Sequence, residues 1–232
     1  DHLAVKDVHP PLYFALLKVW GGLFGFGEAV IRSLSVLVGS LGVLFAFLLA
    51  RRLGGARVGL LAAALVGCSP FCVYYSREAR GYSLLLCVSM AASWLLVRAA
   101  PRFSGARLVA YVAVAALLPY THVFGAFTLL AHGIYALALW RSGETDRRAV
   151  FRLALGGVVI VLLFLPWLPV FLAQTRRVTG GFWIPGPSVV RWAKEWSIEG
   201  PLSYLWVPVL VALGAWGVRH LVRSAPSSAV LV

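Results

Sequence analysis

The side chains best suited to chemistry lie in a short charged segment that follows an apolar run. Glu78 stands between Arg77 and Arg80, and Tyr82 follows two residues later. An ionised carboxylate beside an apolar region is costly unless it is paired or binds a ligand. Two interpretations of Glu78 are therefore open: half of a structural ion pair, or a catalytic base or acceptor-binding carboxylate. In the second, Arg80 suits a phosphate group, whose geometry matches guanidinium.

Two further segments carry candidate polar residues. Asp7 and His9 precede Pro10 and Pro11, which hold them in a fixed direction, although Asp7 is equally suited to capping a helix. His122 follows Tyr120 and Thr121 and is either a binding residue or a structural, hydrogen-bonded histidine.

A later segment combines cations with aromatic residues. Arg176 and Arg177 precede Trp183, which lies among Gly and Pro. We expect this segment to cover a carbohydrate or polyprenyl headgroup, with Trp183 as a stacking surface. For Trp192 and Trp196, a role as anchors at a membrane interface is at least as good an explanation as a role in this cover.

Composition shows which elements must position these residues. Hydrophobic residues make up 61% of the 232 residues and charged residues 12%, with mean hydropathy +0.87. Soluble domains carry about 25% charged residues. The apolar runs are long enough for transmembrane helices and too long for barrel strands. We therefore expect an all-α, polytopic transmembrane bundle. The net charge of +13 does not indicate nucleic acid, because the arginines stand at the ends of apolar runs.

The runs predict about seven spans and one helix in the outer interface, over residues 10–26. The spans are expected at 29–50, 58–75, 82–98, 106–119, 122–140, 153–173 and 203–221. Alternate loops hold twelve arginines and two acids, a charge of +10, whereas the other loops hold nine cations and six acids, a charge of +3. The positive-inside rule places the first set in the cytoplasm and all the candidate residues outside.

No metal site, cofactor or nucleic-acid partner is expected. Cys68, Cys72 and Cys87 fall in or beside apolar runs without acidic or histidine partners, which favours packing. No Asp or Glu lies within a span, as an ion-coupled transporter would require. A transporter or flippase for a lipid-linked sugar, or a noncatalytic scaffold, remains the alternative to an enzyme.

Several motifs, taken in order, resemble bacterial glycosyltransferase family 39-like membrane proteins, which are similar to dolichyl-phosphate-mannose mannosyltransferases. The motifs are Asp7-Val-His-Pro-Pro-Leu-Tyr13, Ser69-Pro70 with Tyr74 to Ser83, Tyr120-Thr-His122, Pro166-Trp167 and Phe182-Trp-Ile-Pro185. The resemblance implies the inverting C-type glycosyltransferase fold. It also implies a polyprenyl-phosphate sugar donor and a lipid, glycan or protein acceptor at the extracytoplasmic face of the inner (plasma) membrane.

The resemblance also implies a single domain over residues 1–232. It comprises an outer loop and interface helix (1–28), a six-span core (29–173), an outer loop (174–202) and a last span (203–221). The family carries an acidic motif after an N-terminal span, and nothing before Asp7 matches it. We expect a fragment truncated at both ends that lacks the family's main catalytic acid, the alternative being that Asp7 belongs to the same loop as a secondary acid. Glu78 and Asp7 are the catalytic acids expected in this chain. His9, Arg80, Tyr82, His122, Arg176, Arg177 and Trp183 are the expected binding residues.

Overall fold

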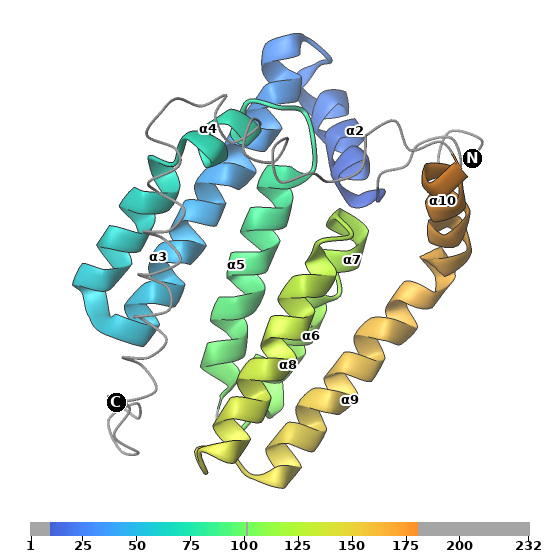
Figure 1. The fold of residues 1–232 in the computed structure, drawn as a ribbon. Coiled ribbons are helices and arrows are strands. Elements are labelled where there is room, and N and C mark those ends of the chain that lie inside the picture. Colours follow the sequence, from blue (N-terminus) through green and yellow to red (C-terminus); the bar gives the residue numbers. More distant parts are fainter. Residues whose placement is uncertain (1–9, 101, 181–232) are drawn as a thin grey trace, which may run out of the picture. The chain divides into compact units, whose positions relative to one another are not determined.

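The computed structural model describes residues 10–100 and 102–180, and these ranges contain helices and no strand (Figure 1). The predicted all-α class is therefore confirmed for this part of the chain. The chain divides into two compact units, Asp1–Val178 and Thr179–Val232. The first unit is described below, and the second lies almost wholly outside the described residues.

The first two described elements are a short helix and a long helical hairpin. Helix α2 spans Leu12–Phe24, close to the predicted interface helix at 10–26. Helix α3 spans Glu28–Gly67 but is divided at Gly55, whose φ of 84° and ψ of 177° are not helical. Gly67 returns to the side chain of Val43, so the two limbs are antiparallel neighbours (Figure 1). They correspond to the predicted spans 29–50 and 58–75.

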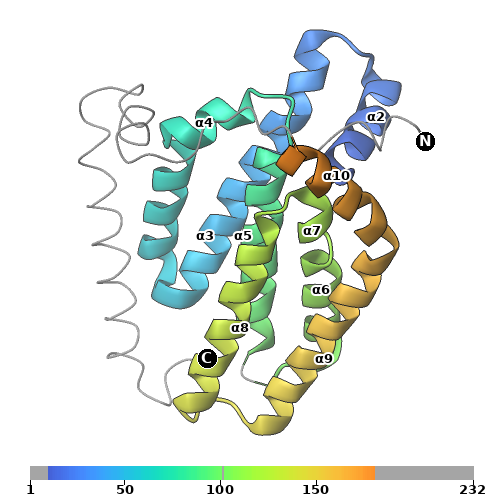
Figure 2. The same cartoon turned by 45° about the vertical axis from the view of Figure 1, so that its right-hand side comes forward.

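The next elements alternate between long helices and short end segments. Helix α4 (Pro70–Ser76) leads into α5 (Tyr82–Ala99), and α6 (Gly105–Ala115) leads into the short α7 (Leu118–Thr121). Helix α5 packs against α3, α6, α7 and α8 and is thus the central helix. Figure 2 shows it between α3 and the α6–α8 group.

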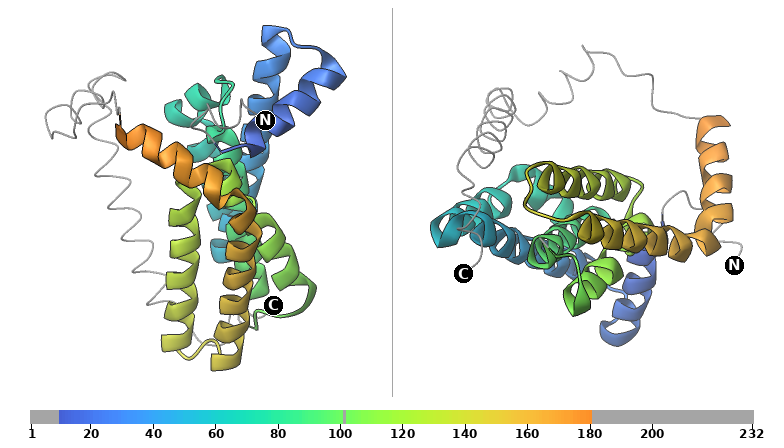
Figure 3. Two further views of the ribbon diagram at one scale, coloured as in Figure 1. Left: turned by 90° about the vertical axis from the view of Figure 1, so that its right-hand side faces the viewer. Right: turned by 90° about the horizontal axis from the view of Figure 1, so that it is seen from below.

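The last described elements form a second hairpin. Helix α8 spans Gly125–Arg141 and α9 spans Arg147–Phe164, with the Asp146 carboxylate accepting a hydrogen bond from the Ala149 N–H at 2.6 Å to cap α9. A 3₁₀ turn at Leu165–Trp167 then leads into α10, Leu168–Gly180. Figure 3 shows α10 leaving the direction of α9 at this turn, where Pro166 interrupts regular helical hydrogen bonding.

Three helices in the described residues are long and apolar enough to cross a membrane. They are Glu28–Gly67, Tyr82–Ala99 and Arg147–Arg176, and Leu12–Phe24 and Gly105–Thr121 are shorter apolar helices. The described residues do not confirm the predicted number of about seven spans, and the span expected at 203–221 lies outside them.

Prolines account for several differences from the predicted boundaries. The span expected at 58–75 is interrupted at Cys68–Ser69, because Pro70 begins a new helix that the Ser69 hydroxyl caps. The span expected at 106–119 divides before Pro119, and that expected at 153–173 begins at Arg147 and changes direction at Pro166.

A buried polar network holds three of the apolar helices together. His132 of α8 is 5% exposed, with Nε2 at 3.0 Å from the Ser93 hydroxyl of α5 and Nδ1 at 3.1 Å from the Tyr111 hydroxyl of α6. In an apolar environment these groups have few other partners, so their hydrogen bonds favour one arrangement of α5, α6 and α8.

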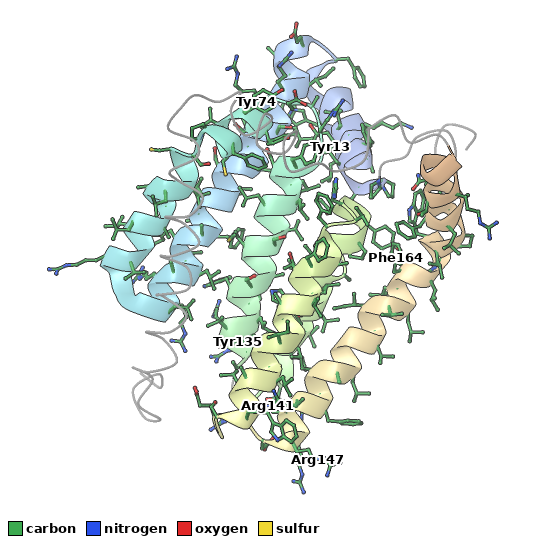
Figure 4. The ribbon with its side chains drawn as sticks, in the orientation of Figure 1. Tyr13, Tyr74, Tyr135, Arg141, Arg147 and Phe164 are labelled. Atoms are coloured by element: carbon green, nitrogen blue, oxygen red, sulfur yellow. The ribbon has the colours of Figure 1, made fainter. Side chains whose placement is uncertain are left out.

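The turns fall into two sets at opposite ends of the helices. The arginine end comprises Arg51–Arg57, Arg98–Arg107 and Arg141–Arg152, and the Glu78 end comprises residues 25–27, 77–81 and 120–124. In Figure 4, Tyr13 and Tyr74 lie near the Glu78 end, whereas Arg141 and Arg147 lie at the arginine end. The predicted grouping of Glu78 with His122, away from the arginine-rich turns, is confirmed.

A prediction concerns the turn that precedes α8. A Cβ atom added at Gly125 would lie 2.7 Å from the Leu118 carbonyl oxygen, so Gly125→Ala forces backbone to move. We expect it to lower the free energy of unfolding by roughly 1–3 kcal/mol. Gly133 lies on the same helix with no atom within 4 Å of such a Cβ, and Gly133→Ala should raise that free energy by about 0.5–1 kcal/mol. Thermal unfolding in detergent measures both, and equal melting temperatures for the two variants would contradict the proposed close contact.

Candidate active site

The loop that carries Glu78 is closed by local hydrogen bonds. It joins α4 to α5, and the Ser83 hydroxyl donates to the Tyr75 carbonyl at 3.0 Å across its base. The N–H groups of Arg77 and Glu78 donate to the carbonyls of Tyr74 and Tyr75. The loop is therefore folded compactly, and its charged side chains are held at the end of the helices.

Arg32 ties this loop to α3. Its Nη1 donates to the Arg77 carbonyl at 2.9 Å, which joins residues 45 positions apart. Another nitrogen of the same guanidinium lies 2.7 Å from the carboxylate of Glu28, one helical turn earlier. The fork of the guanidinium thus holds a carboxylate and a backbone carbonyl together.

These residues surround one cavity at the Glu78 end. Its volume is about 540 Å³, and the described residues that line it are Phe26, Glu28, Ile31, Arg32, Glu78, Ala79 and Arg80. Two carboxylates and two guanidiniums therefore face a common space, with apolar surface from Phe26 and Ile31. Such a lining can hold a phosphate and a hydroxyl-bearing group side by side.

The pair of Glu78 and Arg80 is loose. Arg80 Nε lies 3.7 Å from Glu78 Oε2, beyond hydrogen-bonding distance, and the two side chains are 57% and 32% exposed. An exposed pair with this separation contributes little to stability. The weak pairing leaves both side chains accessible to a ligand, and both interpretations of Glu78 stay open.

The turn before α8 packs directly against this loop. A Cβ atom at Gly81 would lie 3.2 Å from the Thr121 carbonyl oxygen, so the two backbones are in close contact. The rings of Tyr82 and His122 have centroids 5.4 Å apart. The Phe124 N–H donates to His122 Nδ1 at 3.2 Å, so Nδ1 is the acceptor in this turn.

Helix α2 packs against α3 and α7 at the Glu78 end. The Tyr13 hydroxyl lies 2.6 Å from that of Ser35, and Trp20 Nε1 donates to the Val30 carbonyl at 3.0 Å. Burial raises the pKa of Tyr13, so its hydroxyl stays neutral and its bond to Ser35 does not depend on physiological pH. The amphipathic shape of Trp20 suits an interface, where the indole N–H finds a polar partner.

The structure brings some of the predicted residues together. Glu78 and Arg80 line the cavity, and Tyr82 and His122 are in contact immediately behind the loop. Arg176 is exposed on α10 and is not among the described residues that line the cavity. Asp7, His9 and Trp183 lie outside the described residues, as does the side chain of Arg177.

Sequence reasoning missed the two other charged residues of the cavity, Glu28 and Arg32. Their spacing of four places both on one face of a helix, which is a recognisable signal for an ion pair. Nothing in that spacing indicates that the pair lies beside the Glu78 loop, because the contact with the Arg77 carbonyl depends on the packing of α3 against α4 and α5.

The described residues contain no group of three or more His, Cys, Asp or Glu side chains arranged to hold a metal ion. Cys87 is buried, Cys68 is exposed and Cys72 is intermediate, and all three are free thiols. The described residues that line the cavity supply carboxylates, guanidiniums and one aromatic ring.

Comparison with known proteins connects this site to a family. Residues 8–169 match the family described as dolichyl-phosphate-mannose-protein mannosyltransferase, and this match covers more than half of the chain. No curated protein and no solved structure gives a significant match. The matched segment contains every described residue of the cavity and the turn with His122. The chain thus belongs to the dolichyl-phosphate-mannose-protein mannosyltransferase family of membrane glycosyltransferases.

Proposed function

We propose that this protein transfers a sugar from a polyprenyl-phosphate donor to an acceptor hydroxyl, at the extracytoplasmic face of the cell's inner membrane. The family supports a glycosyltransferase of the mannosyltransferase type. The observation that carries the proposal is the cavity in which Glu78 and Arg80 meet beside Arg32. A lipid, glycan or protein would serve as the acceptor.

In the proposed reaction, Glu78 is the base. Its carboxylate accepts the proton of the acceptor hydroxyl while that oxygen attacks the anomeric carbon of the sugar. The bond between the anomeric carbon and the phosphate oxygen breaks, and polyprenyl phosphate leaves with the bonding electrons. The displacement inverts the anomeric configuration. Asp7 is proposed as a second acid of the same outer segment.

Cations stabilise the leaving group in this proposal. Negative charge grows on the phosphate as the bond breaks, so a nearby guanidinium interacts more strongly with the transition state than with the donor. Arg80 lines the cavity and is assigned this role. Arg176 and Arg177 are proposed as further cations, and His9, Tyr82, His122 and Trp183 as residues that bind sugar or headgroup.

The first prediction tests the base. Glu78→Gln removes the proton acceptor while keeping the size of the side chain, so sugar transfer should fall by roughly 10²–10⁴-fold. The measurement is release of polyprenyl phosphate by the detergent-purified protein with polyprenyl-phosphate mannose and a hydroxyl acceptor. Glu144 is exposed at the arginine end, so Glu144→Gln makes the same chemical change far from the cavity. It serves as the matched control and should keep full activity. Equal rates for the two variants would rule out Glu78 as the base.

A second prediction concerns the leaving phosphate. Arg80→Gln should lower kcat by about 10²-fold, and Arg80→Lys should restore part of the loss because it returns the charge without the planar fork. Arg77→Gln removes the same charge from the same loop, but Arg77 is not one of the described residues that line the cavity. It should lose much less activity. A loss in Arg77→Gln as large as that in Arg80→Gln would indicate a general effect of loop charge instead.

A third prediction tests the side of the membrane. With Cys68, Cys72 and Cys87 replaced by alanine, a single cysteine at Arg77→Cys should react with a membrane-impermeant maleimide in spheroplasts. A single cysteine at Ser142→Cys, exposed at the arginine end, should react only after the membrane is opened. The reverse pattern would place the cavity in the cytoplasm and end the proposal.

A further inference from the structure

The arginine end carries many more positive than negative side chains. Ten of its arginines lie in the described residues and all are exposed: Arg51, Arg52, Arg57, Arg98, Arg102, Arg107, Arg141, Arg147, Arg148 and Arg152. Within the described ranges, ion pairs form only at the opposite end, between Arg32 and Glu28 and between Arg80 and Glu78. Glu144 accepts a hydrogen bond from Ser142, and Asp146 caps α9. Within this part of the chain, the positive charge of the arginine end is therefore not matched by ion pairs with acidic side chains.

Some of these arginines converge where α5, α6 and α9 end. Arg152 Nη1 donates to the Arg102 carbonyl at 3.0 Å, across 50 residues of sequence, and Arg107 Nη1 lies 3.4 Å from the Arg98 carbonyl. Phe103 anchors the loop between α5 and α6, since it is fully buried despite a φ of 41°. The backbone of this loop therefore holds the guanidiniums of Arg152 and Arg107.

An apolar stripe on α9 leads directly to this cluster. Phe151, Leu155, Val158 and Leu162 recur at helical spacing and are between 49% and 63% exposed. Arg148 continues the same face one turn earlier. From Phe151 to Leu162 the helix rises about 17 Å, close to the roughly 15 Å depth of one leaflet. A lipid acyl chain lying on this stripe would bring its headgroup to the arginines.

We propose that Arg102, Arg148 and Arg152 form a binding site for an anionic phospholipid, with its acyl chain along α9. Guanidiniums bind phosphate oxygens through paired hydrogen bonds, and basic clusters at the ends of membrane helices attract anionic headgroups. This lipid site is separate from the sugar-transfer cavity, because the two lie at opposite ends of the helices. It does not depend on the function proposed for that cavity.

The test measures retained lipid by native mass spectrometry of the full chain. Detergent-purified protein is mixed with phosphatidylglycerol or phosphatidylcholine of identical acyl chains, and phosphatidylglycerol should be retained at least about tenfold more. The triple variant Arg102→Gln/Arg148→Gln/Arg152→Gln should reduce this retention by about tenfold or more. The control triple Arg51→Gln/Arg52→Gln/Arg57→Gln removes the same charge from the same end and should change it less than twofold.

A single variant guards against misfolding of the triple variant. Arg148 makes no hydrogen bond within the described residues, so Arg148→Gln should keep the melting temperature while reducing phosphatidylglycerol retention by about fivefold. Equal retention of the two lipids would overturn the proposal. Equal losses in the two triple variants would also overturn it, because they would show attraction by the whole charged end and no site at α9.

Discussion

Backbone polar groups in an apolar environment must find their partners within the protein. Helices satisfy this requirement along their length, so irregular backbone is restricted to their ends. In this protein the prolines that interrupt the pattern, Pro70, Pro119 and Pro166, all stand at the beginnings of helices or turns. The same constraint concentrates charged residues at the ends, because ionised side chains are costly in the middle of an apolar helix. The cavity is built from the loops that this rule leaves at one end.

Close backbone packing then decides which loops meet. Gly81 allows its loop to touch the Thr121 carbonyl, and Gly42 allows α3 to approach the backbone of Cys87 on α5. Small residues at such positions let apolar helices come close, where van der Waals contact replaces the hydrophobic effect as the driving force. The contact of Arg32 with the Arg77 carbonyl follows from this packing and draws the Glu78 loop to the start of α3.

The two ends of the bundle differ in the balance of their charges. At the Glu78 end, two carboxylates and two guanidiniums line the cavity, which supports the proposal that a substrate there meets both a base and an anion-binding group. At the arginine end, guanidiniums greatly outnumber acids and mark a surface suited to lipid phosphates. A family whose donor is a lipid-linked sugar needs a protein held firmly in the bilayer, and an anionic lipid bound along α9 would contribute to that anchoring.

The sequence alone determined the helical class and the grouping of the turns into two ends, and it singled out Glu78 as a candidate, since these follow from hydropathy, charge and local motifs. It also carried enough ordered motifs to indicate the family. The tertiary structure decided what lies beside Glu78. The contact of Arg32 with the Arg77 carbonyl joins positions 45 residues apart, and no local pattern encodes it. The loose geometry of Glu78 and Arg80, and the place of Glu28 in the same cavity, likewise arise only when α3, α4 and α5 pack together. Sequence spacing fixes which residues share a helix face, whereas contacts between helices depend on the complementary shapes of many side chains at once.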